Sequence, residues 1–155
     1  MLRNILGAII GYVAMVLVAV GSIGIAWLVL GGEGAFAGEG PQPSLIWLGF
    51  NLVSGFAAAM IGGFVAFKIG RSPGATKILI GLLLVLGILI AVNQQFFAEE
   101  RVTVDKPVAE MSFTEAGKHA VQPAWYNWVI PLVGAAGVAL GGRDRSHSGD
   151  QPRMA

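Results

Sequence analysis

The chain has 155 residues, of which 55% are hydrophobic and only 12% are charged, about half the charged share of an ordinary soluble domain. So few charges cannot cover the surface of a water-soluble fold, and the composition therefore indicates a membrane protein. The chain contains no cysteine and only two histidines, which excludes disulfides, thiolate metal sites and cysteine catalysis.

Four stretches approach or exceed the 20 or so mostly apolar residues that a helix needs to cross a bilayer. The first covers about 5–30 and the second about 45–67, and neither contains a charged residue. The third covers about 75–97, and the fourth, about 125–142, has Pro131 near its beginning, where a kink is expected. The sequence therefore predicts an all-α membrane protein built as a bundle of four transmembrane helices.

The first stretch is followed by Ala35-Phe36-Ala37, which resembles the small-residue site at which a secretory signal is cleaved. The apolar region of such a signal is about 7–15 residues long, and this stretch is far longer. We therefore expect an uncleaved spanning helix.

The predicted connections differ in length and composition. Residues 31–44 are rich in Gly, Pro and Glu and predict a flexible polar loop, whereas 70–74 predict a tight turn. The longest connection, 98–124, contains the amphipathic stretch 108–121, which predicts one or two helical turns. The polar tail, 143–155, is predicted to be disordered.

Basic residues gather on one side of the predicted bundle. The N-terminus, the turn at 70–74 with its flanks, and the tail carry only two acidic residues, Asp144 and Asp150, but seven basic ones: Arg3, Lys68, Arg71, Lys77, Arg143, Arg145 and Arg153. The remaining three bases and seven acids all fall in the two loops on the other side. Because Lys and Arg are retained on the cytoplasmic side of membranes, the pattern predicts that both termini are cytoplasmic.

Small residues recur at four-residue spacing within three of the spans, a pattern that lets two helix backbones approach closely in lipid. The residues predicted to pack helices in this way are Gly7, Gly11, Ser54, Ala58, Gly62, Gly63, Gly137 and Gly141. We interpret these faces as contacts inside one bundle. The alternative is that one of them docks a partner protein or a second copy of the chain.

No charged residue or histidine lies near the middle of any predicted span. Ion pumps, proton relays and most drug exporters need such a residue, so these classes are disfavoured. Asn51 and Ser54, one turn apart in the second span, are polar instead. They predict either a hydrogen bond between helices or part of a ligand site.

Aromatic and amide residues cluster where the third span ends and the fourth begins, and Trp27 and Trp47 fall at a similar depth. The cluster predicts an aromatic belt at the membrane surface. The alternative is a ligand pocket beneath the long loop, lined by Asn51, Asn93, Gln94, Trp125, Tyr126, Trp128, Glu115 and His119.

Glu115 and His119 supply at most half of a metal site, and Ser112 with His119 makes a weaker case for a hydrolase. We therefore expect no metal, cofactor or catalytic residue.

Short motifs suggest a relationship over the second to fourth spans: Gly62-Gly63-Phe64-Val65-Ala66, Arg71-Ser72-Pro73, Pro123-Ala124-Trp125-Tyr126 and Gly141-Gly142-Arg143. With them the chain resembles a loose group of small bacterial four-helix membrane proteins of unknown function. The resemblance implies a bacterial inner (cytoplasmic) membrane and implies no activity.

The sequence favours a non-enzymatic accessory or scaffold subunit, embedded in the lipid bilayer and contacting a membrane-protein partner or a second copy. The alternative is a small transporter or lipid-handling protein with a groove between the second and fourth spans, lined by Asn51 and the aromatic residues at 125–128. A membrane enzyme acting through Glu115 and His119 is the third and weakest reading. No nucleic-acid partner is expected.

Overall fold

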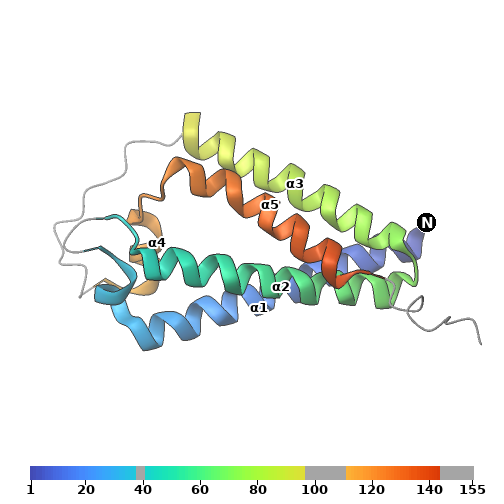
Figure 1. The fold of residues 1–155 in the computed structure, drawn as a ribbon, viewed down its shortest axis with the longest axis horizontal. Helices are drawn as coiled ribbons and strands as arrows, with labels where there is room; N and C mark the ends of the chain where they lie inside the picture. Colours follow the sequence, from blue (N-terminus) through green and yellow to red (C-terminus); the bar gives the residue numbers. More distant parts are fainter. Residues whose placement is uncertain (38–40, 97–110, 144–155) are drawn as a thin grey trace, which may run out of the picture.

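The computed structural model describes residues 1–37, 41–96 and 111–143, and its regular elements there are helices (Figure 1). The helices α1 (Leu2–Ala35), α2 (Leu45–Gly70), α3 (Pro73–Phe96) and α5 (Ala124–Gly141) are all long and apolar enough to cross a membrane. This confirms the prediction of an all-α chain with four helices of spanning length. A short helix, α4 (Phe113–His119), precedes α5 and falls within the stretch predicted to form helical turns. Residues 97–110 of the predicted long loop and 144–155 of the predicted tail lie outside the described residues.

The ends of the helices follow local chemistry. Gly31 interrupts α1 with φ 63° and ψ −174°, a backbone conformation that favours glycine, so the long helical stretch is broken one residue beyond its predicted end. Pro73 is the first residue of α3, where its missing N–H costs no hydrogen bond. Pro131 lies inside α5, which continues on both sides of it.

The four long helices run alternately up and down (Figure 1). The start of α1, the turn between α2 and α3, and the end of α5 meet at one end of the bundle, which we call the basic end because Arg3, Lys68, Arg71, Lys77 and Arg143 lie there. The connection between α1 and α2 lies with α4 at the opposite end, which we call the α4 end. The most extensive helix contacts are those of α2 with α1 and with α5.

Glycines bring α1 and α2 into backbone contact. A methyl carbon built on Gly11 would lie 2.6 Å from the carbonyl oxygen of Gly62, and one built on Gly62 would lie 2.8 Å from that of Gly11. One built on Gly7 would lie 2.8 Å from the carbonyl oxygen of Ala66. No side chain fits between the two backbones at these points.

A second glycine contact joins α2 to α5. A methyl carbon built on Gly63 would meet the backbone of Val138, and one built on Gly141 would meet the backbone of Met60. One built on Gly137 would lie 2.8 Å from the side chain of Ala59. The helix α2 is thus held between α1 and α5 through small residues on two of its faces.

Of the other predicted packing residues, Ala58 is fully buried, whereas Ser54 is half-buried and donates only to the carbonyl of Asn51 in its own helix, at 3.4 Å.

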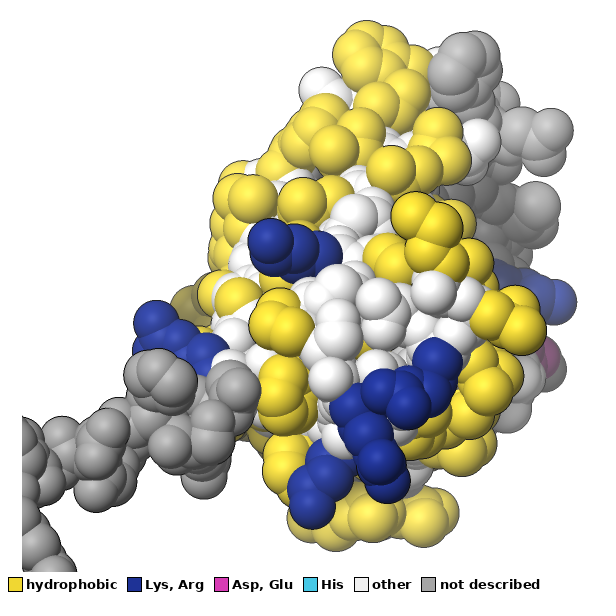
Figure 2. Space-filling model, turned by 90° about the vertical axis from the view of Figure 1, so that its right-hand side faces the viewer, with side chains coloured by type: hydrophobic (Ala, Val, Ile, Leu, Met, Phe, Trp, Pro, Cys, Tyr) yellow, Lys and Arg dark blue, Asp and Glu magenta, His cyan; other side chains and the backbone are white. Residues whose placement is uncertain are grey.

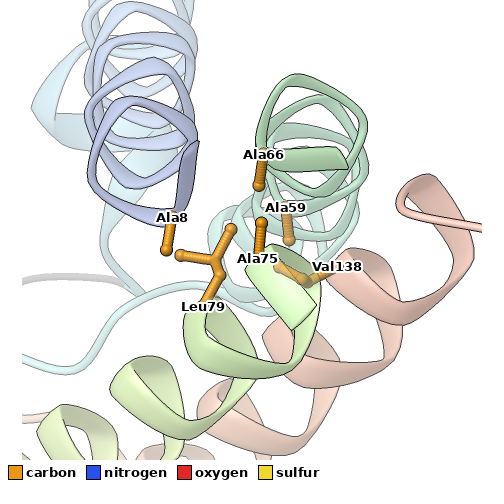
Figure 3. Close-up of a cluster of buried hydrophobic side chains, with 6 residues drawn as sticks. All are labelled: Ala8, Ala59, Ala66, Ala75, Leu79 and Val138. Carbon is orange, nitrogen blue, oxygen red and sulfur yellow. The ribbon is translucent and has the colours of Figure 1, made fainter. Parts of the chain in front are cut away.

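The core between the helices is small and built largely from alanine. Six buried side chains converge from all four long helices: Ala8, Ala59, Ala66, Ala75, Leu79 and Val138 (Figure 3). Lipid tails are as apolar as these side chains, so burial alone does not hold such a bundle together. The close fit of small residues supplies the dispersion contacts that do.

The connection between α1 and α2 differs from the plain flexible loop expected at 31–44. Phe36 and Pro43 form a bridge, and the Ala37 amide donates to the Gln42 carbonyl at 2.8 Å. The Ser44 hydroxyl caps α2 by accepting from the amide of Trp47, and it donates to the Gly34 carbonyl at 2.7 Å. These bonds turn the described part of the loop back over the end of the bundle.

Candidate functional site

A cavity of about 280 Å³, here called the α4 cavity, lies at the α4 end between α1, α2, α4 and α5. Its walls are mainly aromatic and aliphatic, and they include Trp27, Phe36, Trp47, Phe113 and Tyr126. The same cavity reaches Asn51 of α2. A largely apolar space with few polar groups is the usual form of a small-molecule site.

Aromatic side chains that contact one another line part of this cavity. The ring of Trp27 lies 6.0 Å from that of Trp47 and 5.6 Å from that of Phe113, both nearly edge-to-face. This is the geometry that aromatic pairs prefer. Ala116 of α4 packs beside them against Ala35 and Phe36. The helix α4 is therefore placed over the cavity by contacts with α1 and the loop that follows it.

The start of α4 is fixed by a capping box. The Ser112 hydroxyl accepts from the Glu115 amide at 3.4 Å, and the Glu115 carboxylate accepts from the Ser112 amide at 2.9 Å and from its hydroxyl at 2.8 Å. Both side chains thus satisfy donors at the helix start. The capping box thus gives both residues a structural role at the start of α4.

We expect Ser112→Ala to destabilise α4 by about 1 kcal/mol, because Ala cannot accept from the helix amides. Within α4 the Ala116 amide donates to the Ser112 carbonyl and the Ala120 amide donates to the Ala116 carbonyl. Hydrogen exchange at these two amides should then accelerate about fivefold. Ser112→Asp keeps a capping acceptor and serves as the control. Equal exchange in Ser112→Ala and the parent would contradict the role of the cap.

Two polar side chains of the α4 cavity lack a complete set of protein partners. Tyr126 is only 3% exposed, and among the described residues none forms a hydrogen bond with its hydroxyl. Asn51 donates from Nδ2 to the Trp47 carbonyl at 2.8 Å, while no donor of the described part of the chain reaches its Oδ1. The cavity therefore offers one hydroxyl and one free carbonyl acceptor within an apolar wall.

A second cavity of about 250 Å³, the central cavity, lies among α1, α2, α3 and α5. Asn51 and Ile130 line both this cavity and the α4 cavity, so the two spaces are neighbours. Its wall includes Tyr12, Gly87 and Pro131. A methyl carbon on Gly87 would lie 2.5 Å from Cβ of Pro131, so this glycine lets α3 approach α5 beside the cavity.

The structure brings together only part of the pocket predicted from the sequence. Asn51 and Tyr126 line the α4 cavity, but Trp125 and Trp128 are exposed, and Trp128 Nε1 donates to Gln95 Oε1 at 3.0 Å across α5 and α3. Those two tryptophans have the exposure expected of an aromatic belt. Of the three aromatic residues at the start of α5, only Tyr126 is buried and lines the cavity.

The other predicted pocket residues lie elsewhere. Asn93 and Gln94 belong to the last turn of α3 and are at least partly exposed, Glu115 caps α4, and His119 is the last residue of α4. The wall is formed instead by Trp27 and Trp47, whose similar depth in the first two spans was visible in the sequence. Phe36 and Phe113 also line it, and the sequence did not mark them as pocket residues.

No three His, Asp or Glu side chains gather in a group that could hold a metal ion, as far as residues 1–37, 41–96 and 111–143 are concerned. Comparison with the models of known families, with curated proteins and with solved structures finds no match to this chain.

Proposed function

We propose that this membrane protein has a non-catalytic task, the binding of a small amphipathic molecule such as a single-chain lipid in the α4 cavity. The observation that carries the proposal is the pair of polar groups, the Tyr126 hydroxyl and Asn51 Oδ1, left without partners in an apolar cavity. Both atoms keep some accessible surface, so a molecule in the cavity can reach them. A ligand with a hydroxyl at its polar end would donate to Asn51 Oδ1 and accept from the Tyr126 hydroxyl, whereas an ester alone can only accept and would satisfy the tyrosine alone.

The central cavity supports the same proposal. It lies on the other side of Asn51, in the middle of the bundle, and its wall is almost entirely apolar. An alkyl chain placed there would leave its polar group beside Asn51 and Tyr126. The two cavities taken together fall within the usual size range of small-molecule sites, about 300–1,000 Å³. This arrangement favours the lipid-handling alternative over a pure scaffold.

We further propose that the protein lies in a bacterial cytoplasmic membrane with both termini in the cytoplasm. The orientation is supported by the separation of charge, because Arg3, Lys68, Arg71, Lys77 and Arg143 share the basic end while the described acids, Glu33 and Glu115, lie toward the other. The bacterial membrane is carried over from the resemblance of the short motifs alone. The α4 cavity would then be at the exoplasmic surface.

The accessory role favoured by the sequence stays a prediction, and one observation favours it as a second candidate. The outer half of α1 lines the α4 cavity on one side, but Leu17, Val20 and Leu28 are all more than half exposed and leave a second face for a partner. Recovery of a stoichiometric partner from native-lipid particles would support that role. Recovery of the protein with bound lipid alone would favour the first proposal.

The proposed binding is tested by filling the α4 cavity. Ile23 lines it, whereas Ile25, two residues along α1, is 65% exposed and lies outside its wall. We expect Ile23→Trp to lower labelling by a photoactivatable monoacyl lipid about tenfold, since the indole would occupy the ligand volume and a loss of about 1.4 kcal/mol is tenfold in affinity. Ile25→Trp, the matched control, should label as the parent does. Equal labelling of both variants would overturn the proposal.

A further inference from the structure

The basic end presents a second surface, independent of the cavities. Figure 2 looks onto this end and shows Lys and Arg side chains spread over it. All five of its described bases are exposed: Arg3, Lys68, Arg71, Lys77 and Arg143. In the undescribed tail that follows, Asp144 and Asp150 are offset in formal charge by Arg145 and Arg153. The surface therefore carries an excess of positive charge.

Two of these cations have contacts within the protein that leave their charge unneutralised. Arg3 Nε donates to the Gly70 carbonyl at 3.2 Å, and Lys68 Nζ lies 5.5 Å from the centre of the Phe64 ring. Arg71 ends α2 in the left-handed conformation, with φ 51°, and its amide donates to the Phe67 carbonyl at 2.7 Å. Within the described residues, none of the five bases forms an ion pair with a carboxylate.

Exposed apolar side chains occur near these bases in the chain, and one of them, Phe64, is in contact with Lys68. Leu2 precedes Arg3 and is 82% exposed, Phe64 lies beside Lys68 and is 52% exposed, and Ile78 follows Lys77 and is 42% exposed. One molecule can therefore place a negative group on a base and a hydrocarbon chain along the helix next to it. Free phosphate or an acidic protein would use only the first of these contacts.

We propose that the basic end binds the headgroups of anionic phospholipids in preference to zwitterionic ones. The phosphate lies among Arg3, Arg71 and Lys77, and the acyl chains lie along the exposed flanks of α1 and α3. A basic residue near an anionic membrane surface strengthens binding about fivefold. The proposal does not depend on a ligand in either cavity.

The test measures the relative association constant of spin-labelled phosphatidylglycerol and phosphatidylcholine with the full chain in bilayers. We expect the parent to favour phosphatidylglycerol and 1 M salt to remove most of that preference, because the Debye length falls to about 3 Å. In the double variant Arg71→Asn, Lys77→Gln, the ratio of the phosphatidylglycerol to the phosphatidylcholine association constant should fall about fivefold for each base removed. Asn is chosen because it tolerates the left-handed conformation at position 71.

Two further variants make the result decisive. Lys118→Gln removes a base from the α4 end and should leave the preference unchanged, and Lys77→Arg should retain it. If the double variant does not fold, the salt dependence of the parent and the effect of Lys77→Gln alone decide the question. Equal association of both lipids with the parent, or an unchanged preference after removal of the bases, would overturn the proposal.

Discussion

Replacing Gly63 by alanine is expected to destabilise the bundle by about 2–3 kcal/mol, the cost of forcing extra volume into a closely packed contact. The added methyl carbon would meet the carbonyl oxygen, Cα and carbonyl carbon of Val138, all of them backbone atoms. A side chain can rotate away, but here α5 itself has to shift relative to α2. The free energy of unfolding in mixed detergent micelles measures the loss.

Gly55 is the matched control for this prediction. It lies eight residues earlier in α2, and a methyl carbon built on it would meet nothing within 4 Å. Gly55→Ala should therefore be neutral or slightly stabilising, because alanine favours the helix. A Gly63→Ala variant as stable as Gly55→Ala would show that α2 and α5 are not packed as the structure has them.

The number and limits of the spanning helices could be predicted from the sequence because they depend on local properties. Length, hydropathy and the absence of charge determine whether a segment can cross a bilayer, and all three are read along the chain. The break inside α1 at Gly31 and the start of α3 at Pro73 lie within two residues of the predicted limits, since glycine and proline act on their own backbone, whereas the helical stretch that continues from Gly31 to Ala35 was not predicted.

The candidate site was only half predictable because it depends on how the helices are rotated against one another. Trp125, Tyr126 and Trp128 look equivalent in sequence, yet only Tyr126 is buried, and the packing of α5 on its neighbours decides which one. The role of α4 depends likewise on Trp27 meeting Phe113, two residues far apart in the chain. The capping box at Ser112 and Glu115, by contrast, follows a sequence pattern that could have been read directly.

The polar pair in the α4 cavity gives the second large expected effect. Combining Asn51→Leu with Tyr126→Phe should lower the affinity for a monoacylglycerol by about 30-fold to 100-fold, because two hydrogen bonds of about 1–1.5 kcal/mol each are lost. A long-chain alkane, which makes neither bond, should bind the double variant as well as the parent. Native mass spectrometry at graded ligand concentrations measures both affinities.

Stability separates a ligand-binding role from a structural one for the same residues. A hydroxyl that supported the fold would have a protein partner, and its removal would cost stability. The Tyr126 hydroxyl has none among the described residues, so Tyr126→Phe should leave the free energy of unfolding unchanged or raise it by about 1 kcal/mol while ligand affinity falls.

Ser54→Ala, which changes a hydroxyl one turn from Asn51 and outside both cavities, should alter neither quantity appreciably. A parallel loss of stability and affinity in Tyr126→Phe would assign the residue to the fold, because a group that serves only the ligand weakens binding without weakening the protein.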